Sequence, residues 1–313
     1  MPGAQVGNHA PEGKGRVLVV GAGGYLGRSV VRALSKADYE ARGLVHSQQK
    51  AALVRADGGL PVVGDILDPR SVRSAAANCS GVVHLAANPS EGSDPARVRV
   101  EGTRNLVAAA REEGILRLVV GSGYWVYRGQ SGVIREDSPV DPQGESQINY
   151  DAERAGLEAN SPGRLEVLIA RPGMVYGDGS WFRGMAESVK SGEYRVVGEG
   201  KNRWSFVDRW DTGTAFVQIL ESGIAGAVYN VVDGRPASLR EFADRVAAEL
   251  GVVSPPSMAI DAAGREMGTA VAHHLAADRA ASNEKLLAIG WRPRVASYLD
   301  GIPSVLRSMF PKN

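Results

Sequence analysis

Three glycines near the start of the chain have the type and spacing of residues that bind phosphate. Gly21, Gly24 and Gly27 follow an apolar run at residues 17–21 and precede residues 28–34, which have helical periodicity. In such a turn the first glycine permits a positive φ, the second leaves room for a pyrophosphate, and the third lets the helix pack close to the strand. The N-terminus of the helix then offers free N–H groups to the phosphates. The spacing predicts a dinucleotide-binding turn, and an ordinary strand–turn–helix is the alternative.

Strand-like and helix-like segments alternate after this turn, which predicts a parallel sheet covered by helices on both faces. The expected strands lie at residues 17–21, 39–45, 61–64, 81–86, 116–120, 167–170 and 228–232. The expected helices lie at residues 28–34, 72–77, 101–113, 150–159, 239–250 and 281–288. Residues 206–221 are expected to return to the main sheet and continue as a helix. Ser238 and Glu241 have the spacing of a capping box at the start of one helix.

Composition limits the classes of partner. The 313 residues include 36 Lys and Arg against 35 Asp and Glu, and this balance argues against nucleic acid or an anionic membrane as the main partner. The single cysteine, Cys79, excludes an internal disulfide and is expected to be a small apolar filler in a reducing compartment. No apolar run reaches membrane-spanning length, and residues 1–15 are polar and rich in glycine and proline. We therefore expect a disordered tail and a cytoplasmic protein.

Further segments match the pattern of one known family in order and spacing. They are GAGGYLG (21–27), GDILD (64–68), VVHLAA (82–87), VEGTRNL (100–106), RPGMVYG (171–177), FVDRWD (206–211), VYNVVDG (228–234) and IGWRP (289–293), with Tyr150 followed four residues later by a basic residue. After residue 15 the chain resembles the extended short-chain dehydrogenase/reductase superfamily, of the NAD-dependent epimerase/dehydratase type. The resemblance implies an α/β fold with a Rossmann-type doubly wound parallel sheet and a smaller, discontinuous C-terminal substrate domain.

The resemblance also implies a division of the chain. Residues 16–176, together with about 206–235, would form the dinucleotide-binding domain, and residues 177–205 and 236–313 the substrate-binding domain. The active site would lie in the cleft between them. The implied cofactor contacts run from the pyrophosphate through the adenine and the ribose to the nicotinamide. In that order they are Gly21, Gly24, Tyr25, Leu26 and Gly27, then Asp65 and Ile66, then Leu85, Ala86 and Ala87, and finally Pro172, Gly173 and Val175.

The choice between the two nicotinamide cofactors depends on the end of the second strand. An NAD site usually has a carboxylate there, about 20 residues past the glycines, to bind the ribose hydroxyls. This chain has no acid at residues 44–47; it has His46 and Ser47, with Lys50 and Arg28 nearby. These side chains suit a 2′-phosphate, so the sequence favours NADP(H), with NAD(H) as the alternative. An exposed strand end without cofactor contact is the other interpretation of His46.

The catalytic positions depart from the family pattern. The family uses a tyrosine to exchange a proton during hydride transfer, and a lysine four residues later lowers the tyrosine pKa from about 10. Here Tyr150 is kept, but Arg154 replaces the lysine. Gly123 takes the usual serine or threonine position, with Ser122 one residue earlier as the candidate hydroxyl, and Arg99 takes the usual asparagine position. Because arginine is not equivalent to lysine, the helper groups are altered.

Aromatic residues are concentrated toward the expected substrate end. Trp125, Trp181, Phe182 and Trp204 could form an aromatic wall for a hydrophobic or polycyclic substrate, although packing in the core is an equal alternative for each. Gly123 would face the same substrate. The RW–FV pattern around Trp204 resembles carbonyl-reducing family members that act on apolar small molecules. The adjacent His273 and His274 point apart on a helix, so we expect no metal site.

Three functions are compatible with these residues. The first is an NADP(H)-dependent biosynthetic reductase of a ketone or enone on a small hydrophobic molecule. In it Tyr150 donates the proton, Arg154 anchors the ribose, and Ser122 or a main-chain N–H binds the substrate oxygen. The second is an epimerase, dehydratase or isomerase without net redox, and the third is a non-catalytic dinucleotide-binding protein. A small-molecule substrate and a homodimer are the expected partners.

Overall fold

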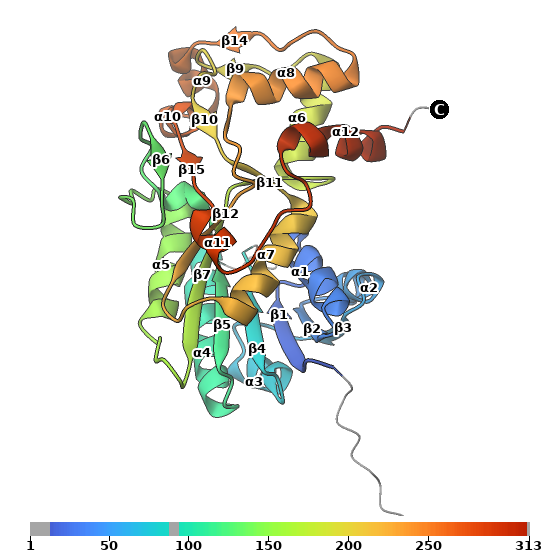
Figure 1. Ribbon diagram of the computed structural model, residues 1–313, viewed down its shortest axis with the longest axis vertical. Coiled ribbons are helices and arrows are strands. Elements are labelled where there is room, and N and C mark those ends of the chain that lie inside the picture. Colours follow the sequence, from blue (N-terminus) through green and yellow to red (C-terminus); the bar gives the residue numbers. More distant parts are fainter. Residues whose placement is uncertain (1–12, 88–93, 312–313) are drawn as a thin grey trace, which may run out of the picture.

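A seven-stranded parallel sheet forms the centre of the molecule (Figure 1). The computed structural model describes residues 13–87 and 94–311. The strand order is β12-β7-β5-β4-β1-β2-β3. Strands β2 and β3 therefore lie on one side of β1, and from β4 onward the chain adds strands on the other side. The strands are β1 (Arg16–Val20), β2 (Glu40–Val45), β3 (Leu60–Val63), β4 (Gly81–His84), β5 (Arg117–Gly121), β7 (Glu166–Pro172) and β12 (Val228–Val231). The predicted Rossmann-type doubly wound α/β fold is confirmed.

Helices cover both faces of this sheet because its strands are apolar on both sides. Val17 and Val19 of β1 face one helical layer, and Leu18 and Val20 face the other. The first layer contains α1 (Tyr25–Lys36), α2 (Gln48–Ala56), α7 (Arg209–Ser222) and α11 (Glu284–Ala288). The second contains α3 (Pro69–Ala76), α4 (Gly102–Glu112) and α5 (Glu145–Leu157), and the chain enters α4 through the π-helical turn η1 (Arg97–Glu101).

A second group of helices lies beyond the main sheet, in the upper part of Figure 1, and this region has its own cluster of buried side chains. Its centre is Phe206 stacked on Phe242, with ring centroids 3.9 Å apart. The helices here are α6 (Ser180–Ser191), α8 (Leu239–Leu250), α9 (Ile260–Met267), α10 (Thr269–Ala276) and α12 (Tyr298–Met309). The capping box at the start of α8 is confirmed, since Ser238 and Glu241 exchange their side-chain hydrogen bonds. The division of the chain into domains stays a prediction.

Short elements connect the two regions. The helical turn η2 (Tyr124–Val126) follows β5. The short strands are β6 (Val133–Ile134), β8 (Met174–Tyr176), β9 (Val196–Val197), β10 (Arg203–Trp204), β11 (Phe206–Asp208), β13 (Ala237–Ser238), β14 (Ser257–Met258) and β15 (Ala280–Ala281). They pair only with one another, in two-stranded ladders outside the main sheet.

The predicted return to the main sheet at residues 206–221 is confirmed for its helix and wrong for its strand. Helix α7 packs on the main sheet, but β11 pairs in parallel with β8, and only β12 rejoins the main sheet. The reason is the crossing at Gly173, whose N–H donates to the carbonyl oxygen of Val231 over 3.0 Å. A Cβ at Gly173 would lie 2.4 Å from the carbonyl oxygen of Ser205, so two backbones meet there.

The helices α2, α6, α9 and α12 were not anticipated by the sequence pattern.

Several observations bear on the remaining expectations. Cys79 is 7% exposed, and burial raises the pKa of its thiol to about 11. Within residues 13–87 and 94–311, none of the helices combines the length and apolar character needed to cross a membrane. In the same residues no three His, Cys, Asp or Glu side chains are arranged to hold a metal ion. Most of the expected N-terminal tail, residues 1–12, lies outside the described residues.

We expect Gly213→Ala to lower the free energy of unfolding by about 1–3 kcal/mol, the usual effect of overpacking. A Cβ at Gly213 of α7 would lie 2.2 Å from the carbonyl oxygen of Ser29 in α1, so the two helices would have to separate. Gly184 of α6 is the matched control, because nothing lies within 4 Å of a Cβ there. Gly184→Ala should stabilise by about 0.5–1 kcal/mol through helix propensity. Urea unfolding of both variants tests the pair; equal effects would contradict the close contact of α1 with α7.

Candidate active site

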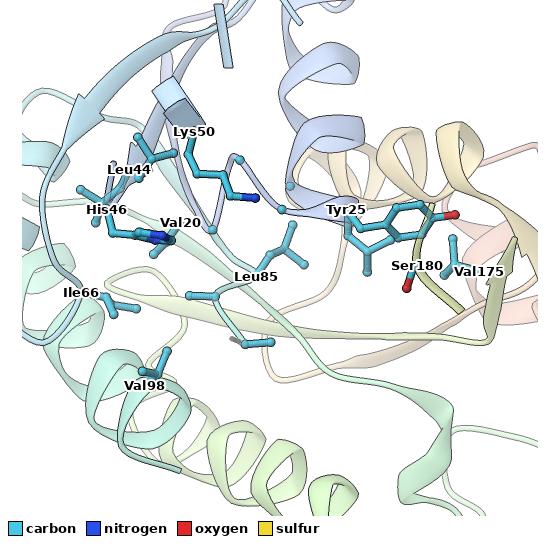
Figure 2. A pocket seen from close by; sticks show the side chains of 18 of the residues that line it. Val20, Tyr25, Leu44, His46, Lys50, Ile66, Leu85, Val98, Val175 and Ser180 are labelled. Carbon is cyan, nitrogen blue, oxygen red and sulfur yellow. The ribbon is translucent and has the colours of Figure 1, made fainter. Parts of the chain in front are cut away.

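A cleft of about 530 Å³ opens at the carboxyl ends of β1, β2 and β4 (Figure 2). This volume is in the range of about 300–1,000 Å³ that is usual for small-molecule and cofactor sites. The structure brings sixteen of the sequence-predicted residues into its lining, from all four cofactor segments, from the basic group and from the aromatic set. They are Gly21, Gly24, Tyr25, Leu26, Gly27, His46, Lys50, Asp65, Ile66, Leu85, Ala86, Ala87, Trp125, Gly173, Val175 and Trp181.

The glycine turn forms one wall of the cleft by close backbone approach. Gly21 has φ 80°, and a Cβ there would lie 2.7 Å from the backbone nitrogen of Ala86. A Cβ at Gly27 would lie 2.0 Å from the carbonyl oxygen of Gly21. The residue that precedes α1, Gly24, is exposed and has no side chain that could cap the helix. The first turn of α1 also carries no acidic residue. The N–H groups of this helix end are therefore available to an anion, and the cradle fits a dinucleotide pyrophosphate.

Two basic side chains lie at one end of the cleft. Figure 2 shows His46 and Lys50 there, beside Leu44, with Tyr25, Ser180 and Val175 at the other end. The aliphatic part of Lys50 covers the glycine turn, since a Cβ at Gly23 would lie 2.8 Å from the Lys50 Cβ. Among the described residues Lys50 forms no ion pair with a carboxylate. Asp65, the acid in this lining, accepts the N–H of Leu67 at Oδ1 over 2.9 Å.

Two residues predicted for this end have other contacts in the structure. The Ser47 hydroxyl caps α2 by accepting the N–H of Lys50 over 3.3 Å. The Arg28 guanidinium pairs with Asp57, with 2.6 Å between Nε and Oδ2. Neither side chain belongs to the cleft lining. The Ser47 hydroxyl is thus used as a helix cap and the Arg28 guanidinium in an ion pair, whereas His46 and Lys50 face the cleft.

None of the predicted catalytic residues belongs to the lining of this cleft. Tyr150 is half-buried in α5 and packs against the aromatic cluster of the substrate region. The Arg154 side chain is 63% exposed, and its Nη2 lies 3.8 Å from Glu158. The Ser122 hydroxyl is buried without a hydrogen-bond partner among the described residues. Gly123 has extended backbone at the start of η2, while Pro172 ends β7, one residue before the cleft.

Two buried arginines, one in η1 and one in β7, bond to side chains of α5. The Arg99 guanidinium donates from Nε and Nη2 to Asn149 Oδ1, the former over 3.0 Å, and from Nη1 to the Ala86 carbonyl oxygen over 3.4 Å. Arg171, at the end of β7, forms a two-bonded ion pair with Glu153 at 2.9 and 2.5 Å. Sequence reasoning recognised Arg99 only as a departure from the family pattern, because its partner lies fifty positions away.

A neutral imidazole lies next to Arg99. His84, the last residue of β4, is fully buried. Burial and the charge of Arg99 lower the pKa of His84 to about 3, so the ring is uncharged at neutral pH. Of these two neighbouring side chains, only Arg99 is charged at neutral pH.

Aromatic residues form the opposite end of the site. Trp125 lines the cleft, and its ring centroid lies 4.3 Å from that of His274 and 5.0 Å from the Arg279 guanidinium. Trp204 is buried behind it, edge-on, with 5.3 Å between the ring centroids. Trp181 donates from Nε1 to the Val175 carbonyl oxygen over 2.7 Å. Phe182 is fully buried in the core.

Some lining residues were not singled out from the sequence. They are chiefly Gly23, Val98, Met174 and Ser180. Gly23 belongs to the glycine run and could have been included. Ser180 has φ 53° at the start of α6, an unusual backbone for a serine, and no sequence signal marks it. Val98 and Met174 have the composition of ordinary core residues.

Comparisons with known proteins agree with this geometry. The pattern of the NAD dependent epimerase/dehydratase family matches residues 17–232. A 3-diazoavenalumate denitrifying reductase from a Streptomyces species is 33% identical over 92% of this chain and 99% of its own length. A 4-hydroxy-2-methyl-3-oxo-4-farnesyl-3,4-dihydroquinoline-1-oxide ketoreductase from Stigmatella aurantiaca is 30% identical over 72% of this chain and 71% of its own.

Solved structures show the same fold. A dTDP-glucose 4,6-dehydratase from Streptomyces venezuelae, solved with NAD, is 25% identical, with a TM-score of 0.78 over 93% of this chain and 96% of that one. The chain therefore belongs to the NAD-dependent epimerase/dehydratase family, and it is an NAD(P)-dependent oxidoreductase of the extended short-chain dehydrogenase/reductase type.

Proposed function

We propose that this protein is an NADP(H)-dependent reductase of a ketone or enone on a small, hydrophobic, secondary-metabolite-like molecule. One observation carries the proposal: a single cleft extends from two basic side chains, past the glycine turn, to an apolar aromatic surface. That surface is formed by Trp125, Met174 and Trp181. The relative named as a ketoreductase of a farnesyl dihydroquinoline-1-oxide supports a ketone on a hydrophobic molecule, and the relative named as a 3-diazoavenalumate denitrifying reductase supports reduction of a small molecule.

The residues of the chain divide the work of such a reaction. The bound nicotinamide supplies the hydride. Tyr150 donates the proton to the substrate oxygen, and the Ser122 hydroxyl or a main-chain N–H holds that oxygen by a hydrogen bond. Within residues 13–87 and 94–311 the Ser122 Oγ has no hydrogen-bond partner, which supports this role, since a buried hydroxyl normally finds an acceptor or a donor. The aromatic surface excludes water from the reacting atoms.

A direct assay separates this function from chemistry without net redox. Purified protein is incubated with NADPH and a panel of aromatic and polycyclic ketones and enones, while the absorbance of the reduced nicotinamide is followed. Stoichiometric loss of absorbance with product formation is the expected result. Product without net loss would instead indicate an epimerase or dehydratase, the activity class of the neighbour from Streptomyces venezuelae. Binding of both cofactor forms without any turnover would indicate a non-catalytic protein.

Tyr150→Phe is expected to lower kcat by about 10²–10⁴-fold, since it removes the proton donor and keeps the ring. The dissociation constant for NADPH, measured by fluorescence quenching, should change by less than about threefold, because the hydroxyl is not needed for cofactor affinity. Tyr39→Phe is the matched control: its hydroxyl bonds Glu221 over 3.2 Å, at the surface. Full turnover by Tyr150→Phe would remove Tyr150 from the mechanism.

Arg154 is proposed as the ribose anchor. Its surface contact with Glu158, at 3.8 Å, is an exposed ion pair of about 0–1 kcal/mol, so little opposes a turn of the side chain toward the ribose. Arg154→Met should raise KM for NADPH by about tenfold, the equivalent of one charge-assisted hydrogen bond. Arg164→Met, at an exposed position beyond α5, is the control. An unchanged KM in Arg154→Met would exclude the ribose contact.

The preference for NADP(H) is supported by the basic end of the cleft. A 2′-phosphate needs donors and positive charge, which His46 and Lys50 provide, and residues 44–47 carry no acid to repel it.

We expect Lys50→Ala to weaken NADPH binding by about tenfold and NADH binding by less than about twofold, because only the phosphate loses a charged partner. Isothermal titration with each cofactor measures the two effects. Arg55→Ala removes an exposed cation from the same helix and should change neither affinity. Equal losses for NADPH and NADH would show that Lys50 does not read the phosphate.

A further inference from the structure

Helix α5 carries Tyr150, the proposed proton donor. Two other side chains of the same helix, Asn149 and Glu153, bond to neighbouring elements and so fix the rotation of the helix about its axis. Asn149 and Glu153 are one turn apart and therefore share a face. On that face Arg99 of η1 bonds Asn149 and Arg171 of β7 bonds Glu153. Because each residue advances an α-helix by about 100°, Tyr150 points roughly a quarter-turn away from Asn149. Whatever holds Asn149 therefore also determines where Tyr150 points.

The two arginine contacts differ in kind. Arg171 and Glu153 form a buried, two-bonded ion pair, in which each charge has its counter-charge. Arg99 is 5% exposed, and among the described residues its hydrogen-bond partners are the neutral oxygens of Asn149 and Ala86. Burial lowers the pKa of Arg99 to about 10, which still leaves it charged at neutral pH. Among the described residues no carboxylate is hydrogen-bonded to Arg99, and only the nearby charge of Glu153 opposes the lowering of its pKa. Burying a cation among neutral hydrogen-bond partners is costly, which argues that Arg99 does more than fill space.

The backbone around Arg99 is also unusual. Arg99 lies in the π-helical turn η1, and Thr103 secures this turn by donating from Oγ1 to the Arg99 carbonyl oxygen over 2.6 Å. π-Helical turns are rare and are frequent at functional sites. In this turn Val98 lines the cleft while the next residue, Arg99, reaches α5. The turn thus places one residue at the cleft and the following one behind it.

Arg99 connects the cleft with α5 directly. Its Nη1 donates to the carbonyl oxygen of Ala86, which follows β4 and lines the cleft against Gly21. Its other donors hold Asn149, the residue before Tyr150. We propose that Arg99 is a positioning residue: it ties Asn149 to Ala86 and so sets the rotation and height of the Tyr150 turn of α5 relative to the cleft. This inference rests on the proposed function of Tyr150.

Kinetics of Arg99→Met test the proposal. A misplaced donor slows the reaction more than it weakens binding, so kcat should fall by about 10–100-fold. The dissociation constant for NADPH should stay within about threefold, because no cofactor contact is removed. Arg97→Met is the matched control from the same turn; it loses only the exposed ion pair with Glu101 and should keep full kcat. Wild-type kcat in folded Arg99→Met would overturn the proposal.

Two further variants distinguish positioning from general loss of structure. Arg99→Lys keeps the charge without the planar fork, so it should recover part of kcat. Asn149→Ala should lower kcat as Arg99→Met does, and the double variant should be no worse than the poorer single one, because both break one link. Independent, additive losses would contradict a shared link. If Arg99→Met does not fold, Arg99→Lys and Asn149→Ala decide the question.

Hydrogen exchange gives a readout that does not depend on activity. In the cofactor-free protein, amides of residues 145–153 should exchange faster in Arg99→Met and remain as in the wild type in Arg97→Met. Unchanged exchange in Arg99→Met would show that Arg99 does not hold α5. If Tyr150→Phe is fully active, the proposed function fails instead, and the exchange experiment still reports on the Arg99 link by itself.

Discussion

The site depends on one close approach of two backbones, where the turn after β1 meets the segment after β4. Gly21 has no side chain, and a Cβ there would lie 2.7 Å from the nitrogen of Ala86. A substitution would push the two segments apart, because backbone atoms cannot move aside as a flexible side chain can. The carbonyl oxygen of the same Ala86 accepts from Arg99, so the cofactor cradle and the support of α5 share one short segment. One residue therefore lies against the glycine turn through its backbone nitrogen and accepts the Arg99 hydrogen bond at its carbonyl oxygen.

Local patterns predicted the fold well. The glycine run and the alternation of strands with helices depend on neighbours in sequence, so the order of the elements and most of the cleft lining could be predicted. Contacts between distant segments could not. The pairing of Arg99 with Asn149 joins residues fifty positions apart, and β11 was assigned to the wrong sheet because its apolar character fits either partner. At Gly173 the backbone crossing, invisible in composition, decides between the two.

At the basic end of the cleft, too, the sequence could not predict which side chains would face the cleft. His46, Ser47, Lys50 and Arg28 are equivalent as a cluster of donors in sequence. In the structure Ser47 caps a helix and Arg28 pairs with Asp57, which leaves His46 and Lys50 facing the cleft. Ser47 and Arg28 are each bonded to another group of the protein, so two of the four predicted donors do not face the cleft. Which donors are bonded in this way depends on distances of a few ångströms.

Trp125 illustrates how the C-terminal segment contributes to the cleft. Its ring packs against His274 of α10 and against Arg279, which donates from Nη1 to the His274 carbonyl oxygen over 2.9 Å. The orientation of this cleft residue therefore depends on side chains about 150 positions later in the chain.

The lone thiol has a practical consequence. Cys79 is the one cysteine of the chain, and its burial and raised pKa keep the nucleophilic thiolate scarce at neutral pH. A cysteine introduced at an exposed position would accordingly be the site that a maleimide dye or spin label modifies. Fluorophores or nitroxides could then be attached to chosen elements around the cleft without first removing a native cysteine.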